Sequence, residues 1–297
     1  EALERVRQMY RDLRPSGEEP TVHDWRKQFE VMCGEFPVPP GTTVDEVDAG
    51  GVPALWVRAP GVMGDERTVV FFHSGGYVMG RAKDYRQFGS ALSFAAGARV
   101  LLVDYRLAPE HPFPAGMEDG LAAYRWALTQ TDPSRIVVAG DSAGGGMTLA
   151  VLVAQRDSGG TLPAVGVCIS PWADLAAEGH SMTTRSDVDP IVQRELVLTL
   201  AAAYLGEGKD PKSTPLASPL YADLAGLPPM LIVVGDAETL LDDSIRLEAK
   251  ILDAGGWVEL DVAEDMPHVY PLFNPILPEG MQAIGRIGNF IRFRTSG

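Results

Sequence analysis

The sequence predicts an α/β fold in which a mostly parallel central sheet is flanked by helices. From residue 68 onward, short apolar runs alternate with segments of helical pattern, as they do in successive βαβ units. These runs are continuously apolar rather than alternating, which is typical of strands covered by helices on both faces. The 297 residues, 45% of them hydrophobic, suffice for one buried core with a small accessory region.

The chain opens with two amphipathic helical patterns within residues 1–40. The first places apolar side chains on one helical face, and the second repeats them at i, i+4 and i+7. The side chains concerned are Leu3, Val6, Met9, Tyr10 and Leu13, followed by Trp25, Phe29 and Met32. Paired helices ahead of the core predict an N-terminal helical cap region.

The expected core falls into two parts, residues 41–172 and 225–297. Its first part begins with two strands joined through Ala49-Gly50-Gly51, a hairpin signal that predicts an antiparallel edge. The strands expected after it are the runs TVVFF, RVLLVDY, RIVVAG, AVGVCIS and MLIVVG, with WVELDVA near the end. Between the two parts, residues 173–224 are mainly polar, with a helical pattern only over 194–204. We expect this insertion to contribute to the cap over the active site.

Charge and cysteine content argue against several classes of partner. Forty Asp and Glu residues outnumber 25 Lys and Arg, and a net charge of -15 would repel nucleic-acid phosphates and anionic lipid headgroups. No apolar stretch approaches the roughly 20 residues that cross a bilayer. Cys33 and Cys168 lack CxxC or metal-ligand spacing, so we expect two unpaired thiols in a reducing cytoplasm. The sequence therefore predicts a cytoplasmic protein with a small-molecule substrate, no nucleic-acid or membrane partner and no metal.

The segment Gly140-Asp141-Ser142-Ala143-Gly144 lies between an apolar strand pattern and an apolar helical run. G-x-S-x-G in this strand-turn-helix setting is a nucleophile elbow, whose turn is so sharp that glycines are needed beside the serine. The alternative is a glycine-rich turn with a capping serine. A phosphate loop is disfavoured because no Gly-Lys-Ser/Thr follows. We predict that Ser142 is a nucleophile.

A second motif, His73-Ser74-Gly75-Gly76-Tyr77, follows the run TVVFF. Enzymes with the elbow carry an HGGG-type loop at this place. Rigid amide groups of such a loop stabilise the oxyanion that forms when an ester is attacked, and the loss of one donor costs roughly 3 kcal/mol. We predict the amides of Gly75, Gly76 and Ala143 as the donors, with His73 as an anchor for the loop.

The general base is expected to follow the nucleophile and the acid, because the chain order in this fold is Ser, then Asp or Glu, then His. Of the five histidines, only His180 and His268 follow Ser142, and His180 leaves no room for an acid on a later strand. This predicts His268 as the base. Near the end of the MLIVVG run, Asp236 and Glu238 are both candidates for the acid, since spacing does not separate them.

Other side chains near these motifs have expected positions as well. We expect Tyr77, Met79, Asp141 and Trp172 to contact the substrate. Asp242 and Asp243 are expected on the solvated face of the helix that follows the MLIVVG run.

The motifs HSGGYVMG, DYRLAPEHPFPA, GDSAGGG, SPWADL and DMPHVY stand in the order found in the hormone-sensitive-lipase-like α/β hydrolases, the bacterial family IV esterases. The chain resembles this family from about Thr68 to His268. The resemblance implies an α/β-hydrolase fold with a helical cap, and a structural role for the loop at 106–111. It also favours Glu238 as the acid, because the family's D-P-L-x-D-E segment aligns with residues 238–243. Ser74 stands where the family has glycine.

The resemblance implies a carboxylic-ester hydrolase for short to medium acyl esters. Ser142, Glu238 and His268 would act through an acyl-enzyme intermediate without a cofactor. One alternative is a non-catalytic ligand-binding protein, because the family includes plant hormone receptors that lost the histidine; His268 is retained here. Lactone or amide hydrolysis is another, since sequence separates these chemistries poorly. Family members often pair through an edge strand, which implies a homodimer.

Overall fold

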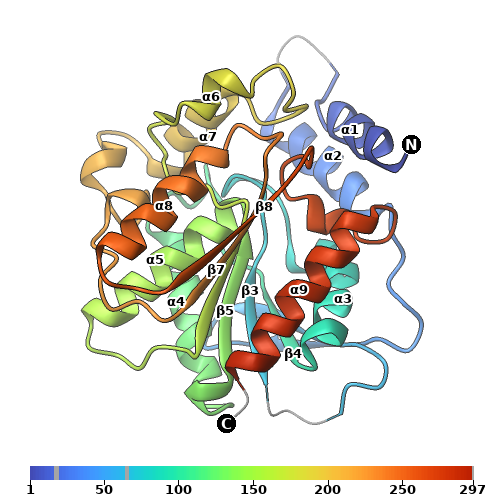
Figure 1. Cartoon of the computed structure of the whole chain (residues 1–297), viewed down its shortest axis with the longest axis vertical. Coiled ribbons are helices and arrows are strands. Elements are labelled where there is room, and N and C mark those ends of the chain that lie inside the picture. The colour runs from blue at the N-terminus through green and yellow to red at the C-terminus, as the bar shows by residue number, and fades with distance from the viewer. Residues whose placement is uncertain (17–19, 64–66, 296–297) are drawn as a thin grey trace.

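An eight-stranded sheet forms the centre of the computed structural model, which describes residues 1–16, 20–63 and 67–295 (Figure 1). Within these residues the strand order is β1-β2-β4-β3-β5-β6-β7-β8. The strands are β1 (Thr43–Asp48), β2 (Pro53–Arg58), β3 (Thr68–Phe72), β4 (Arg99–Val103), β5 (Ile136–Asp141), β6 (Val165–Ile169), β7 (Met230–Gly235) and β8 (Val258–Ala263). β2 pairs antiparallel with β1 and β4, and all other neighbours are parallel. The predicted mostly parallel sheet with an antiparallel hairpin at its edge is confirmed.

Helices cover both faces of this sheet. α3 and α9 lie on one face, and α4, α5 and α8 lie on the other (Figure 1). The helices are α1 (Ala2–Asp12), α2 (Val22–Gly34), α3 (Arg86–Ala96), α4 (Ala115–Ala127), α5 (Ala143–Asp157), α6 (Ser181–Thr184), α7 (Arg194–Leu205), α8 (Leu241–Asp253) and α9 (Pro278–Arg294). Every residue of β3, β5, β6 and β7 is buried, which explains why their sequences are apolar almost without interruption.

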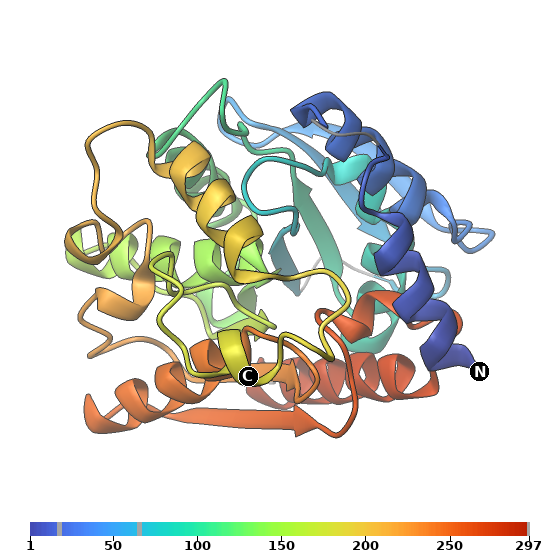
Figure 2. The same cartoon turned by 90° about the horizontal axis from the view of Figure 1, so that it is seen from above.

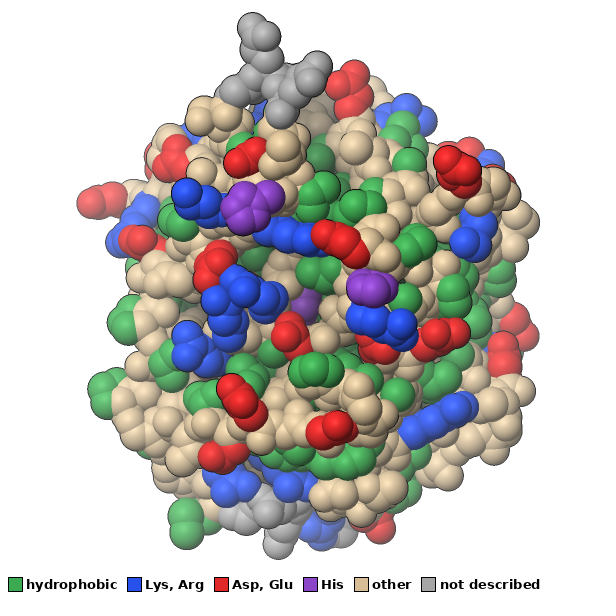
Figure 3. Space-filling model, turned by 180° about the vertical axis from the view of Figure 1, so that it is seen from behind, with side chains coloured by type: hydrophobic (Ala, Val, Ile, Leu, Met, Phe, Trp, Pro, Cys, Tyr) green, Lys and Arg blue, Asp and Glu red, His purple; other side chains and the backbone are tan. Residues whose placement is uncertain are grey.

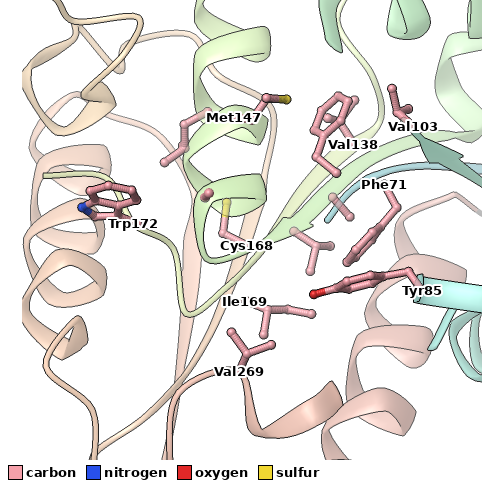
Figure 4. Close-up of a cluster of buried hydrophobic side chains, with 14 of the residues drawn as sticks. Phe71, Tyr85, Val103, Val138, Met147, Cys168, Ile169, Trp172 and Val269 are labelled. Atoms are coloured by element: carbon pink, nitrogen blue, oxygen red, sulfur yellow. The ribbon is translucent and has the colours of Figure 1, made fainter. Parts of the chain in front are cut away.

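The core beneath the carboxyl ends of the strands combines side chains from several strands and from α5 (Figure 4). Phe71 of β3 packs on Tyr85, with ring centroids 5.8 Å apart. Figure 4 shows Tyr85 pointing its hydroxyl group into this apolar cluster. A hydroxyl buried in such a place needs a hydrogen-bond partner, and its partners lie at the active site described below.

Three helices outside the layered core, α1, α2 and α7, lie above the carboxyl ends of the strands (Figure 2). α2 begins with a reciprocal pair of capping bonds. The Asp24 amide donates to Thr21 Oγ1 at 3.3 Å, and the Thr21 amide donates to Asp24 Oδ2 at 2.9 Å. Two amides at the helix start are thereby satisfied, so α2 has a well-defined first turn over the sheet.

The loop at 106–111 ties neighbouring elements together. Arg106 forms an ion pair with Asp119 of α4 at 2.8 Å. Glu110 pairs with Arg26 of α2 at 2.6 Å. These contacts link the loop to the core on one side and to α2 on the other.

Residues 173–224 are anchored to the core through α8. Asp243 Oδ2 accepts hydrogen bonds from the amides of Ala173 and Asp174, both at 2.8 Å. The prediction that Asp243 lies on a solvated face is wrong. Its side chain is fully buried, because the first turn of α8 packs against the start of this segment, and Asp242 is half-buried there as well.

Both cysteines are free, in line with the predicted unpaired thiols, and both are buried. No helix in the described part of the chain combines the length and the apolar character needed to cross a membrane. Acidic and basic side chains are intermixed on the face shown in Figure 3.

Candidate active site

Ser142 stands at the turn between β5 and α5 in a strained backbone conformation. Its φ is 54° and its ψ is -117°, a region that L residues rarely adopt. A Cβ on Gly144 would lie 1.9 Å from the carbonyl oxygen of Phe72, and one on Gly140 would lie 2.2 Å from that of Gly144. Neither position can hold a side chain, which is why the sequence needs glycine on both sides of Ser142.

Ser142, His268 and Glu238 form one hydrogen-bonded chain. The Oγ of Ser142 lies 2.9 Å from Nε2 of His268, and Nδ1 of His268 lies 2.6 Å from Oε2 of Glu238. All three side chains are buried. Asp236 has another partner, because its Oδ1 accepts a hydrogen bond from the Asp265 amide at 2.7 Å. The structure thus brings Glu238, and not Asp236, to the histidine.

Ser170, directly after β6, holds both the carboxylate and the histidine loop. Its hydroxyl donates to Oε1 of Glu238 at 2.7 Å and accepts from the Val269 amide at 3.0 Å. The Gly235 amide donates to the same carboxylate oxygen at 2.8 Å. Burial disfavours the imidazolium, but the charge and hydrogen bond of Glu238, together with the charges of Asp189 and Asp141, outweigh that cost and raise the pKa of His268.

The loop after β3 carries Gly75 and Gly76 along the wall of the cavity that also holds Ser142. Gly75 has a φ of 113°, and a Cβ there would lie 2.3 Å from the Met79 carbonyl oxygen. The Gly75 carbonyl accepts a hydrogen bond from the Met79 amide at 2.9 Å. Ala143 is the first residue of α5, where helix amides have no intrahelical partner. The three predicted oxyanion donors therefore lie on two segments that both border Ser142.

A buried polar chain joins the elbow to this loop. The Tyr85 hydroxyl donates to Oδ2 of Asp141 at 2.6 Å and lies 2.7 Å from the Oγ of Ser74. Because Tyr85 gives its single proton to Asp141, Ser74 is the donor to Tyr85. Burial raises the pKa of Asp141 to about 7, against the opposing effect of the Tyr85 hydrogen bond. Asp141 was an expected substrate contact, but its side chain is fully buried against Tyr85 and is not among the residues that line the cavity.

The buried His73 side chain holds the same loop through its ring and one ring nitrogen. Its ring stacks on Tyr105 with centroids 4.3 Å apart, and its Nδ1 lies 2.7 Å from the Ser74 carbonyl oxygen. Burial lowers the pKa of His73 to about 4, so the ring is neutral and Nδ1 is the protonated nitrogen that donates. Within the described residues, no group of three or more His, Cys, Asp or Glu side chains could hold a metal ion.

The cavity at Ser142 has a volume of about 80 Å³ and an almost entirely apolar wall. Three parts of the chain contribute to it: the first two helices, the segment 173–224 and the core. The apolar and aromatic wall residues are Tyr10, Leu13, Phe29, Met32, Ile191, Val192, Leu196, Val197, Leu200, Met79, Trp172, Leu240, Val269 and Leu272. Met79 and Trp172, two of the expected substrate contacts, are among them.

Tyr77, another expected substrate contact, is not among the residues that line this cavity. Its ring lies flat against Tyr204, with centroids 3.7 Å apart, and only 2% of the residue is exposed. Tyr77 therefore serves as a packing partner for α7. Its position next to Gly76 in the sequence gave no information on the direction of its side chain.

Several site residues were not singled out from the sequence. Tyr10 was placed on an apolar helical face, but its hydroxyl donates to the carbonyl oxygen of His268 at 2.5 Å. Ser170 follows an apolar strand without any motif that marks it. The apolar residues of α7 that reach the cavity had helical spacing as their only signal.

A strained serine at a strand-to-helix turn, bonded to a buried histidine and carboxylate at the carboxyl edge of a parallel sheet, defines an α/β hydrolase. Residues 69–272 match the family model for the alpha/beta hydrolase fold. The chain is 47% identical to an acetyl-hydrolase of Streptomyces hygroscopicus, over 88% of this chain and 86% of that protein. It is 37% identical to a carboxylesterase of Mycobacterium tuberculosis, over 79% and 76% of the two chains.

Solved structures agree with these relatives. An esterase from the bacterial hormone-sensitive lipase family matches with a TM-score of 0.95 and 50% identity, over 99% of this chain and 98% of that one. EstE5, soaked with p-nitrophenyl butyrate, matches with a TM-score of 0.93 and 44% identity, over 100% and 99% of the chains. The chain belongs to the hormone-sensitive-lipase-like esterases of the α/β-hydrolase superfamily, and it is a carboxylesterase.

Proposed function

We propose that Ser142, His268 and Glu238 hydrolyse esters as nucleophile, general base and acid. The observation that carries this proposal is the unbroken hydrogen-bonded chain from the Ser142 hydroxyl through both ring nitrogens of His268 to Glu238. A carboxylate at Nδ1 fixes the tautomer that leaves Nε2 free to accept a proton, and it stabilises the imidazolium formed during reaction.

In the first half-reaction, His268 takes the proton of Ser142 as its oxygen attacks the ester carbonyl carbon. The carbonyl oxygen becomes an oxyanion, which the amides of Gly75, Gly76 and Ala143 stabilise. The imidazolium then gives its proton to the departing alcohol oxygen, and the acyl group remains on Ser142. In the second half-reaction, His268 activates a water molecule that releases the acid and restores Ser142.

The wall of the cavity supports a proposal for the substrate class. Aliphatic and aromatic side chains dominate it, and neither lysine nor arginine lines it in the part of the chain that the structure describes. Such a wall favours neutral esters with short to medium acyl groups over charged ones. The names of the relatives, acetyl-hydrolase and carboxylesterase, support this class.

Residues 1–40 and 173–224 act as the cap in this proposal. Their contribution to the cavity wall encloses the acyl group and limits its length. Acyl-chain profiling with p-nitrophenyl esters tests this part. We expect the highest kcat/KM at short to medium chains, and a preference for long-chain triglyceride emulsions would contradict it.

Variant kinetics test the assignment of the three residues. With p-nitrophenyl butyrate, Ser142→Ala and His268→Ala should each lower kcat by about 10⁴-fold or more. Glu238→Gln and Asp236→Asn form a matched pair, since each removes one charge after β7. Only Glu238→Gln should reduce kcat strongly, and an equal or larger loss in Asp236→Asn would reject Glu238 as the acid.

A further inference from the structure

The first helix reaches the site through Tyr10. This residue is 3% exposed and forms part of the cavity wall, and its hydroxyl donates to the backbone carbonyl of His268 at 2.5 Å. The ring packs edge-on against Phe273, with centroids 5.1 Å apart, so its position is fixed independently of the hydrogen bond. α1 therefore contacts the histidine loop at the residue that carries the base.

The backbone around His268 needs such support. Val269 adopts a φ of 50°, which a β-branched residue rarely does. The Ser170 hydroxyl holds the Val269 amide from the core side at 3.0 Å, and Tyr10 holds the preceding carbonyl from the α1 side. The histidine is thus fixed from both sides of one peptide unit.

The segment 173–224 reaches the acid in a similar way through Asp189, which is 4% exposed. One of its carboxylate oxygens accepts hydrogen bonds from the amides of Ile191 and Val192, at 3.0 and 2.8 Å. The other accepts from the amide and the hydroxyl of Thr239, at 2.8 and 3.2 Å. Thr239 directly follows Glu238, and both Ile191 and Val192 line the cavity.

Asp189 also belongs to the charged surroundings of His268. The groups that act on the imidazole are Glu238 from the loop after β7, Asp189 from the segment 173–224 and Asp141 from the elbow. Burial raises the pKa of Asp189, and the charge of His268 and the hydrogen bonds from Thr239, Ile191 and Val192 oppose that rise. In its ionised form Asp189 stabilises the imidazolium of His268. Removal of this charge therefore lowers the affinity of His268 for a proton.

We propose that Tyr10 and Asp189 are positioning residues, through which the two segments above the cavity align the base and the acid. The proposal rests on the proposed function, because it takes His268 and Glu238 as the reacting pair. In this account the cap sets kcat as well as substrate size, since each of its segments holds one loop of the site.

Tyr10→Phe tests the contact of α1 with His268, because it removes the hydroxyl and keeps the ring against Phe273. We expect kcat for p-nitrophenyl butyrate to fall about 3- to 10-fold, with KM within about twofold. Tyr124→Phe is the matched control, since its buried hydroxyl donates to the Thr161 carbonyl at 2.8 Å, in a bond between α4 and the loop after α5. The control should keep the wild-type kcat.

Asp189→Asn tests the second contact with a readout that altered packing alone would not move. Because it removes a negative charge near His268, the acid limb of kcat/KM should move to lower pH while kcat falls. Asp243→Asn is the matched control, since Asp243 is a buried carboxylate that also accepts backbone amides but is not among the groups acting on His268. Its acid limb should stay at the wild-type pH.

Thermal unfolding followed by circular dichroism shows whether each variant is folded. If Asp189→Asn does not fold, the kinetics of Tyr10→Phe alone test the proposal. The proposal is overturned if folded Tyr10→Phe keeps the wild-type kcat, or if the acid limb of Asp189→Asn does not move. Its failure is distinct from failure of the proposed function. Full activity in Ser142→Ala or His268→Ala would reject the function itself, whereas unchanged positioning variants beside inactive Ser142→Ala reject only this inference.

Discussion

At the residue scale, the charge of His268 decides whether the site can react, because only the neutral imidazole accepts the Ser142 proton. Glu238 raises the pKa of His268 against the cost of burial. Glu238→Gln should therefore move the acid limb of kcat/KM to lower pH, together with a fall in kcat of about 10²- to 10⁴-fold. Rates with p-nitrophenyl butyrate from about pH 5 to 9 measure both effects. An acid limb that stays in place would show that Glu238 does not govern the histidine.

Asp141 gives a second residue-scale prediction, concerning stability. Burial raises its pKa to about 7, whereas an unfolded carboxyl titrates near about 4. The native state thus holds a proton that the unfolded chain releases, and stability from this group is lost as pH rises from about 4 to 7. Asp141→Asn keeps a hydrogen-bond acceptor for Tyr85 without the charge. As pH rises through this window, the free energy of unfolding of Asp141→Asn should increase relative to that of the wild type, by up to about 4 kcal/mol.

Urea unfolding of both proteins at the two ends of that pH window measures this gain. Because other buried carboxylates titrate equally in both proteins, the difference between them isolates Asp141. A difference that does not change with pH would contradict the role assigned to its burial.

The sequence pointed to Ser142 and His268 because the elbow has strict steric needs and the chain order leaves one histidine, and the structure brings the two side chains within hydrogen-bond distance. Spacing could not separate Glu238 from Asp236, and only the resemblance favoured the residue that meets His268. The packing of Tyr77 against Tyr204 was not foreseen, since motif neighbours do not reveal where a side chain points. The contact from Tyr10 to His268 joins residues 258 positions apart, and no local pattern carries such information.

At the element scale, the start of α5 depends on a glycine that cannot be replaced. A Cβ at Gly144 would lie 1.9 Å from the Phe72 carbonyl oxygen, in the backbone of β3. Gly285 in α9 is a matched control, because a Cβ there would meet nothing within 4 Å. We expect Gly144→Ala to lose its activity or its fold, and Gly285→Ala to gain up to about 1 kcal/mol from helix propensity. Thermal unfolding and esterase rates measure both, and an active Gly144→Ala protein of normal stability would contradict this account of the elbow.

The elements themselves were largely predictable. Strands buried on both faces must be apolar throughout, so β3 to β7 stand out in the sequence. The amphipathic patterns of α1 and α2 showed that each helix has a buried face, but not that this face would line a cavity. Asp243 was misjudged because a helical pattern does not show which distant segment covers a side chain. The segment that buries its carboxylate lies some 70 positions earlier in the chain.

At the scale of the whole molecule, β8 is the terminal strand of the described sheet. Trp257 and Val262, at this edge, are 42% and 45% exposed. We expect two copies to pair through β8 about a twofold axis, because an open edge strand offers unpaired backbone groups. Light scattering at micromolar concentration should give a dimer, and Val262→Lys should weaken it. A monomeric wild type under these conditions would reject this pairing.

The central claim is that the hydroxyl oxygen of Ser142 attacks the acyl carbon of the ester and that His268 activates this hydroxyl. Reaction with a p-nitrophenyl phosphonate ester tests this most directly, because the serine adduct is stable and can be located by peptide mass spectrometry. We predict one equivalent of p-nitrophenolate and one adduct on the peptide that contains Ser142, with labelling greatly slowed in His268→Ala and absent in Ser142→Ala. Labelling of another residue, or a wild-type enzyme that hydrolyses p-nitrophenyl butyrate after full exposure to the phosphonate, would contradict the account.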